Sequence, residues 1–244
     1  MKKKVLTIVA AILCAALLVA GSVMGTLAYL TSTAKVTNTF TVGDVKIDLD
    51  ESLVNLYGKL VDDGKTRVHL NEYHLVPGTT YIKDPRVSIA PGSEASFIFV
   101  KVENGFAGTS VVVTEEEQNA GAKTIAQQMA ENGWTIVEGT TDIYSFNGTA
   151  AKGYNESDPA SSTGNGAVKM TTSGAVEKSA NSVLINVFEN FTVSQKANFG
   201  DLEDTDHNGK IDPKIEVTAY AVQGTFTSPK AAWEATFGAE NGNS

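Results

Sequence analysis

Short runs of β-prone residues, separated by turn-forming residues, follow one another along most of this 244-residue chain. Residues 45–50 alternate apolar and polar side chains with a period of two, which is the pattern of a strand with one solvated face. Residues 36–42 are β-branched or aromatic at many positions, and Gly43 and Asp44 between the two runs predict a hairpin. Residues 95–102 place apolar side chains on both faces, which predicts a strand that is covered on both sides. Further strands are predicted at residues 86–90, 109–113, 134–137, 143–146, 183–188, 191–194 and 214–222.

Helical patterns are few in this sequence. Residues 123–132 predict one short helix, and residues 229–237 predict another, with Ser228 as its cap and Pro229 in its first turn. Many short strands with helices only as connectors favour an all-β fold over an α/β sheet. We therefore expect an antiparallel β-sandwich, jelly-roll-like in its topology, with a few short helices.

Two further segments complete the predicted domain. Residues 52–61 and 65–70 flank a turn signal, Asp62-Asp63-Gly64, and predict a second hairpin. Residues from about 139 to 180 contain much Gly, Ser, Thr and Asn and few large apolar groups, so we expect a surface excursion there. The length of the chain fits one domain over residues 29–244, with the excursion as an insertion, and the sequence shows no internal repeat.

The N-terminus has the order of regions found in a secretory signal. Lys2, Lys3 and Lys4 precede an apolar run over residues 5–20, and no further charged residue appears before Lys35. A basic segment, an apolar segment and a stretch of smaller residues are the three parts of a signal peptide. The chain is therefore expected to be exported and to act outside the cell, at its surface or in a matrix.

The same segment suggests where a signal peptidase would cut. Thr26 and Ala28 are small enough for the cleavage pocket, so we predict cleavage between Ala28 and Tyr29 and assign residues 1–28 to the signal peptide. The uncharged stretch is also long enough to span a bilayer, and an uncleaved anchor is the alternative. On the first interpretation, the chain contacts the membrane only through its signal, before cleavage.

Composition excludes several classes of function. The net charge is −9, and loss of Lys2, Lys3 and Lys4 with the signal would bring it to −12. A surface this acidic repels phosphate, which argues against nucleic-acid binding. The only cysteine, Cys14, lies within the apolar run, so the expected mature domain has neither disulfides nor thiolate chemistry.

A run of acidic and amide side chains resembles part of a calcium-binding loop. Oxygen-bearing residues stand at alternating positions around Gly209, as such loops require: Asp204, Asp206, Asn208 and Asp212. The last ligand position, which should hold a bidentate carboxylate, is occupied by Ile215, and Glu216 comes one place too late. Two interpretations stay open, an Asx-rich turn without metal and a weak calcium site.

Other chemical groups give little sign of catalysis. His69, Glu72 and His74 lie close together, but their spacing is not that of a zinc-protease helix, and a solvated loop is the expected structure. Trp134 and Trp233 stand among apolar neighbours and are expected in the core. We predict no catalytic residues and no cofactor other than weakly bound calcium.

Several segments resemble, in their order along the chain, secreted proteins that depend on the signal peptidase SipW, the TasA/camelysin family. The segments are GTLAYLT at 25–31, VTNTFTVGDVKIDLDE at 36–51, LVPGTTYIKDP at 75–85, SEASFIFV at 93–100 and VTAYAVQ at 217–223. The resemblance covers most of the expected mature chain except the excursion. It implies a jelly-roll-like domain and export; for the TasA members, it also implies assembly into fibres of a biofilm matrix by passing an N-terminal strand to the next subunit.

Two function classes follow from the residues and the resemblance. The first is a structural protein of the cell surface or extracellular matrix, whose partners are copies of itself or other matrix proteins, with the signal peptidase as a partner during export. The second is a secreted camelysin-like metallopeptidase or a calcium-dependent binding module of the same fold. The sequence contains no zinc motif that could carry the peptidase activity. An extended, nearly uncharged N-terminal segment could add to an exposed sheet edge, which favours the first class.

Overall fold

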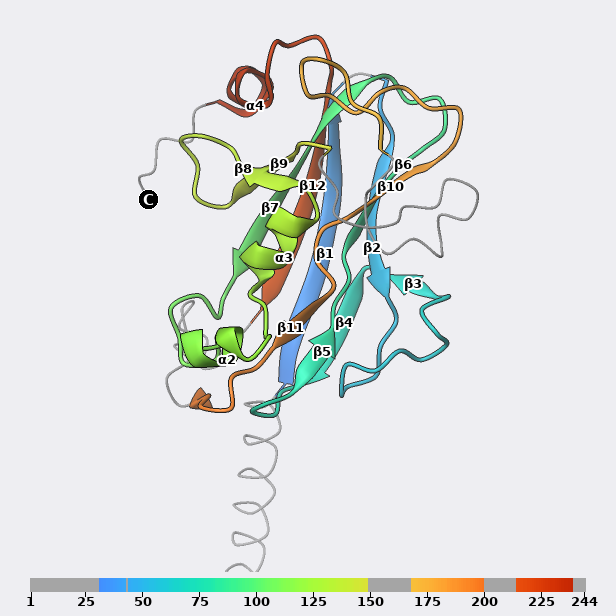
Figure 1. Cartoon of the computed structure of the whole chain (residues 1–244). Helices are drawn as coiled ribbons and strands as arrows, with labels where there is room; N and C mark the ends of the chain where they lie inside the picture. The colour runs from blue at the N-terminus through green and yellow to red at the C-terminus, as the bar shows by residue number, and fades with distance from the viewer. Residues whose placement is uncertain (1–30, 43, 149–167, 200–213, 239–244) are drawn as a thin grey trace, which may run out of the picture.

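The computed structural model describes residues 31–42, 44–148, 168–199 and 214–238, and for residues 31–42 it describes the backbone only. Figure 1 shows an elongated β-structure with helices along one side and at one end. The strands are β1 (Thr31–Val42), β2 (Ile47–Ser52), β3 (Arg67–Val68), β4 (Leu70–His74), β5 (Thr80–Ile82), β6 (Arg86–Ile89), β7 (Ser96–Asn104), β8 (Trp134–Ile136), β9 (Ile143–Phe146), β10 (Val183–Asn186), β11 (Asn190–Thr192) and β12 (Ile215–Gln223). The helices are α2 (Glu115–Asn119), α3 (Ile125–Glu131) and α4 (Pro229–Phe237).

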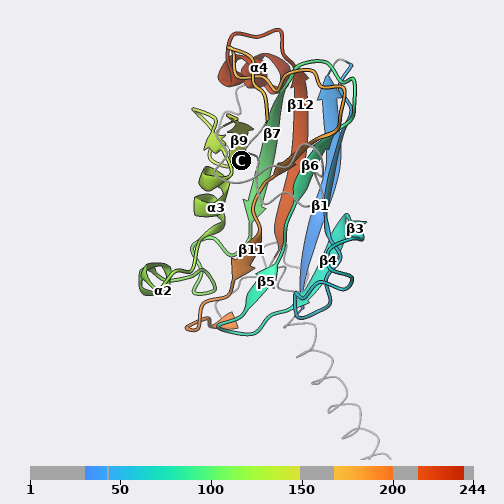
Figure 2. The ribbon, with the colours of Figure 1, turned by 45° about the vertical axis from the view of Figure 1, so that its right-hand side comes forward.

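The strands form a sandwich-like arrangement of sheets. A six-stranded sheet has the order β4-β1-β12-β7-β9-β8, a four-stranded sheet the order β10-β6-β2-β3, and β11 pairs with β5. Figure 2 shows the long strands β7, β12 and β1 standing side by side. All strand pairs but one are antiparallel within the described residues, and the exception is β1 with β12. The expected all-β sandwich with few short helices is confirmed.

Strand β7 has a core on each of its faces, as predicted. Ile98 and Val100 face the main core, whereas Phe97 and Phe99 belong to a second cluster. Helix α4 covers that second cluster with Trp233, whose ring centroid lies 5.3 Å from that of Phe99. A strand buried on both sides needs apolar residues at consecutive positions, and this one has them. Both tryptophans are buried, as expected.

The predicted N-terminal hairpin is wrong. β1 and β2 belong to different sheets: β1 pairs with β12 and β4, and β2 pairs with β6 and β3. The segment between them does not turn back, because Asp44 accepts a hydrogen bond from Glu94 N (3.1 Å) and Lys46 accepts one from Ala90 N (2.8 Å). These bonds fix residues 44–46 to the segment that follows β6, in the sheet that contains β2, and the Val45 side chain is buried there.

Two other strand predictions fail for local reasons. Residues 109–113 form turns instead of a strand, because the Thr109 hydroxyl donates to Phe106 O (2.8 Å) and accepts from Val111 N (3.2 Å), replacing ladder bonds. The strand predicted at residues 52–61 is wrong: Ser52 ends β2, and residues 53–61 form a loop with a single bridge between Val54 and Leu60. The hairpin in that region joins β2 to β3 instead.

The excursion predicted from about 139 to 180 is only partly described, because residues 149–167 lie outside the described ranges. Its first part contains β9, a strand the sequence predicts. Near its end, Val176 is buried and bridges to both Ser96 and Met170. The return of the excursion is therefore attached to the start of β7.

Helix α4 has the predicted bounds, with Ser228 as its cap, and α3 lies within the predicted residues 123–132. Helix α2 is an addition to the prediction. Its signal is a capping box, in which Thr114 and Glu117 each bond to the other's backbone N–H. No helix among the described residues has the length and apolarity needed to cross a membrane.

We expect Glu117→Gln to make the domain less sensitive to acid. The Glu117 carboxylate accepts hydrogen bonds from Thr114 N and Gln195 N, both 2.7 Å, and these bonds lower its pKa from 4.5. A lowered folded-state pKa stabilises the domain above pH 4.5, and this stabilisation is lost as the pH falls through the lowered value. The variant should lose about 1 kcal/mol at pH 7, and the difference from wild type should shrink below pH 4.5. Urea unfolding across this pH range, with Glu115→Gln as control, measures the effect; an unchanged difference at acidic pH contradicts it.

Candidate functional site

Strand β1 occupies a slot between β4 and β12 in the six-stranded sheet. Its first part runs antiparallel to β4, with Thr31 opposite His74 and Lys35 opposite Leu70. Its second part runs parallel to β12, from Val36 opposite Val217 to Val42 opposite Val222, with an irregularity between Thr37 and Phe40. The two walls of the slot therefore hold different halves of the same strand.

The β12 wall of the slot lies in the interior of the protein. One edge of β12 pairs with β7 over the whole range Ile215–Gln223, and β1 covers the opposite edge of β12. Val217, Ala219 and Ala221 of β12 are fully buried. An uncovered edge of this kind would present unpaired backbone groups beside apolar side chains, and such an edge accepts another strand readily. The slot is therefore built to hold a strand of the β1 type.

The predicted cleavage site adjoins this slot in the sequence. Ala28 and Tyr29 lie outside the described residues, and β1 begins at Thr31, two positions after Tyr29. Cleavage after Ala28 would therefore leave a free chain end almost at the first paired residue of β1.

A second candidate site is a buried ion pair between the β5 to β6 connection and β2. Lys83 Nζ lies 2.8 Å from Glu51 Oε2, and both side chains have 0% exposure. Burial lowers the pKa of Lys83, while the negative charges of Glu51 and Asp84 act in the opposite direction. The second carboxylate oxygen of Glu51, Oε1, is buried without a hydrogen-bond partner among the described residues. Such a pair depends strongly on both of its members.

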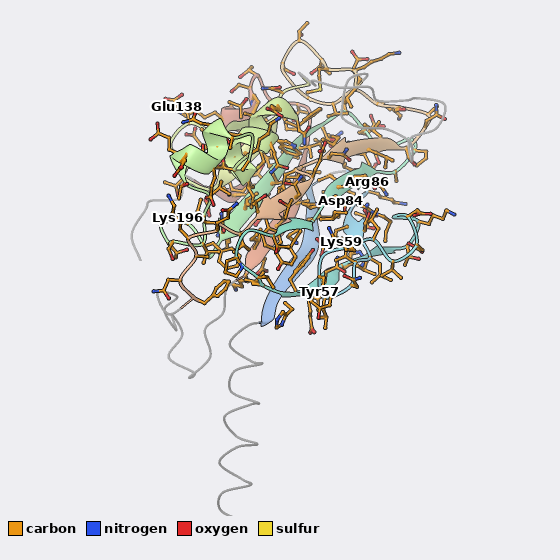
Figure 3. All side chains as sticks on the ribbon, turned by 60° about the horizontal axis from the view of Figure 1, so that its bottom comes forward. Tyr57, Lys59, Asp84, Arg86, Glu138 and Lys196 are labelled. Atoms are coloured by element: carbon orange, nitrogen blue, oxygen red, sulfur yellow. The ribbon has the colours of Figure 1, made fainter. Side chains whose placement is uncertain are left out.

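A partly buried network continues this pair toward the surface. Asp84 accepts bonds from Ser52 N (2.7 Å), Ser52 Oγ (2.7 Å) and Arg67 Nη1 (2.9 Å). Arg67 also donates from Nε to Asp50 Oδ1 at 2.7 Å. Figure 3 shows Asp84 close to Arg86, whose Nε lies 3.5 Å from Asp50 Oδ1. This charged cluster ties β2 and β3 to the connection between β5 and β6.

Aromatic side chains pack around the inner end of the charged cluster. Tyr73 is fully buried, and its hydroxyl donates to Ile82 O at 3.0 Å. Burial raises the pKa of Tyr73, and the nearby charges of Glu51 and Asp84 raise it further. The Tyr73 and Tyr81 rings both lie against Phe191 of β11, at centroid distances of 5.3 and 5.1 Å. The groups are therefore held in place rather than available to a substrate, and their role is structural.

The sequence analysis did not identify this charged cluster. Its members come from separate segments of the chain. Only the run Lys83-Asp84-Pro85-Arg86, between two β-prone stretches, places several charged residues of the cluster together in the sequence. Charged residues are rarely fully buried unless they are paired. The fully buried position of Lys83 could not be read from that run, because it depends on Glu51, thirty-two positions away.

The histidines do not form a metal site among the described residues. His74 lies on β4, so the predicted solvated loop is wrong in this part, and His69 precedes that strand. His69 Nε2 lies 3.2 Å from Asp48 Oδ1, and both side chains are exposed. Glu72 is exposed on β4. The described part of the chain contains no group of three or more His, Cys, Asp or Glu side chains that could hold a metal ion.

The predicted calcium ligands are not placed by the structure. Asp204, Asp206, Asn208 and Asp212 all lie outside the described residues, so the choice between an Asx-rich turn and a weak calcium site stays a prediction. The structure does place Ile215, which begins β12 and is buried. Its side chain belongs to the main core, although it stands at the position where a calcium loop would have its last carboxylate.

Two hollows lie beside helix α3. One, of about 490 Å³, has Gln128 in its wall, and this side chain is already bonded to backbone atoms of Glu189 (3.0 Å) and Asn190 (2.9 Å). The other, of about 260 Å³, is mainly apolar and is lined in part by Phe106 and Phe191. Neither hollow contains a histidine or a serine in its lining.

Comparison with known proteins does not assign the chain to a family. It matches no protein-family model, no curated protein and no solved structure. Its function must therefore be inferred from its own residues, and above all from the slot that holds β1.

Proposed function

We propose that this chain is a secreted structural protein of the cell surface or extracellular matrix, which assembles by N-terminal strand addition, as its resemblance to the TasA/camelysin family implies. The single observation that supports this proposal is the position of β1 between β4 and β12. The strand nearest the predicted cleavage site fills an internal position of the largest sheet. A neighbouring copy offers an identical slot.

Exchange of β1 between copies replaces every backbone pair that it breaks. A neighbour's β1, placed in the same register, would meet the same residues of β4 and β12. Exchange of an identical element in this way has a low cost in free energy, and head-to-tail exchange that does not close produces a filament. The free energy of each junction therefore comes from bonds that the monomer already makes, and high protein concentration shifts the balance toward polymer.

Cleavage after Ala28 is expected to start the assembly. Ala28→Phe places a bulky side chain where the peptidase requires a small one, so the precursor should stay in the membrane fraction and no polymer should form. Mass spectrometry of the secreted protein reports the cleavage position. A secreted wild-type chain that retains Met1, or that begins far from Tyr29, contradicts the prediction.

The proposed function is tested with the purified chain 29–244. We expect fibres that grow with concentration in electron microscopy and sedimentation, because a free N-terminal strand can enter another copy's slot. Casein hydrolysis that chelator abolishes would instead support the alternative camelysin-like metallopeptidase. A chain that stays monomeric at high concentration, without hydrolysis, contradicts assembly by strand addition.

A further inference from the structure

Most of the exposed large hydrophobic side chains come from one stretch of the chain. Among the described residues there are seven, and the one at a distance in the sequence is Ile136, 45% exposed. The other six come from residues 56–76 and are here called the apolar face: Leu56, Tyr57, Leu60, Val61, Leu70 and Val76. Tyr57 is 62% exposed and Val61 56%. Single exposed apolar residues are ordinary, whereas several on one stretch of chain make that stretch a candidate contact surface.

The apolar face lies beside the first residue of β1. Thr31 is paired with His74, and His74 N donates to Leu56 O at 2.7 Å. The Tyr57 ring meets the His74 ring edge-on, with centroids 6.1 Å apart. Figure 3 looks from the end at which β1 begins and shows Tyr57 there, with Lys59 close by. The apolar face is thus next to the start of β1, where the residues before Thr31 are joined to the domain.

Those preceding residues identify what covers the face. The chain has no charged residue between Lys4 and Lys35, and the uncharged run is long enough to span a bilayer. It continues into the first residues of β1, so a chain still carrying its signal has this end of the domain at the membrane surface. We propose that the apolar face rests on the lipid bilayer in the uncleaved precursor.

The chemistry of the face suits the lipid–water interface. Tyrosine is enriched at that interface because its ring is apolar and its hydroxyl is polar. Lys59 is the only charged residue between Asn55 and Val61, and its long side chain can cover apolar groups while its ammonium reaches water or an anionic headgroup. Apolar side chains with a basic residue among them are typical of segments that lie in the interface without crossing the membrane.

The backbone of this region is less suited to adding a strand from a second copy. His74 N is occupied by Leu56 O, and Ile82 N by Gly58 O (3.1 Å), so the loop that carries Tyr57 already covers β4 and β5. The face therefore offers side chains rather than a free strand edge, which fits a lipid surface better than β-pairing. Contact with the bilayer would hold the domain close to the scissile bond until the signal is cut.

The test uses the full precursor in lipid vesicles of phosphatidylethanolamine and phosphatidylglycerol. In a Cys14→Ser background, a single cysteine is placed by Tyr57→Cys or, as the matched control, by Ile136→Cys, and carries a fluorescent label. Ile136 is also exposed and apolar but lies outside the face. Lipids with a quencher near the headgroup should quench the label at position 57 several-fold more strongly than the label at position 136.

Each other outcome counts against the proposal. Equal quenching at the two positions, or none at either, shows that the face does not touch lipid. Self-quenching at position 57 that rises with protein density, without quenching by lipid, shows that a second copy covers the face instead. A Val61→Cys variant repeats the measurement in case the change at Tyr57 disturbs its contact with His74. The proposal depends on the export signal but not on fibre assembly, which is measured separately on the lipid-free chain 29–244.

Discussion

Lys83→Met is expected to lower the free energy of unfolding of the 29–244 domain by about 3 to 5 kcal/mol, because it leaves the Glu51 carboxylate buried without its counter-ion. Oε1 of that carboxylate already lacks a hydrogen-bond partner among the described residues. The variant would also remove Lys83 Nζ, the donor to Oε2. Urea unfolding at neutral pH measures the loss. The matched control is Lys196→Met: Lys196, labelled in Figure 3, lies on the surface and pairs with Glu116 at 2.8 Å, so its loss should change stability far less than Lys83→Met does.

A double variant separates the ion pair from simple packing. Lys83→Met with Glu51→Leu removes both charges and keeps apolar volume, so it should recover most of the stability lost in Lys83→Met. Two results would contradict a stabilising role for the buried pair. One is a Lys83→Met variant with the same free energy of unfolding as the wild type. The other is a double variant that is less stable than Lys83→Met. Both measurements need only the folded monomer, so they are independent of polymerisation.

The second large effect is expected from a chain that lacks β1. A chain of residues 44–244 has an empty slot, and a synthetic peptide of residues 29–42 should fill it. Refolded with peptide at about 100 times its dissociation constant, the truncated chain should gain about 2.7 kcal/mol of stability. Thermal unfolding at increasing peptide concentration gives the dissociation constant. A peptide of the same composition in scrambled order is the control.

The same peptide should stop polymerisation of the complete 29–244 chain. It competes with β1 of the next copy for each open slot, so fibres should become shorter as its concentration rises. Binding of the scrambled peptide with equal strength would contradict a register-specific slot. The peptide could also bind the truncated chain and yet leave the fibre length unchanged. That result would contradict fibre growth by strand addition, although it would still support a binding slot for β1.

Sequence patterns predicted those elements whose burial is decided locally. β7 shows apolar residues on both faces within its own sequence, and α4 shows its cap and first-turn proline. The partner of β1 was not predictable in this way, because Val36 pairs with Val217 across almost the whole domain. Gly43 and Asp44 signalled a hairpin, but hydrogen bonds from the 90–94 segment decide the path of the chain there.

β4 shows a different reason for a missed prediction. Its inward positions are Asn71 and Tyr73, so the alternation of apolar and polar residues is hidden by a buried amide. Asn71 is satisfied by Val54 N (3.0 Å) and Ser52 O (2.9 Å), groups that no local pattern points to. Of the predicted sites, the calcium ligands and the cleavage residues lie outside the described ranges, whereas the slot and the charged cluster depend on distant partners and appear only in the fold.

The parallel pairing of β1 with β12 also sets the order in which the domain can be completed. β1 is among the first residues of the domain to emerge during synthesis, and its partner in β12 follows about 180 residues later. Contacts between such distant residues form late, because the intervening chain must first be ordered. At the usual rates of synthesis, of about 5 to 20 residues per second, β1 waits for roughly 10 seconds or more before that half of its pairing becomes available. Until then the second half of β1 lacks its partner strand, so the six-stranded sheet can be completed only after nearly the whole domain has been made.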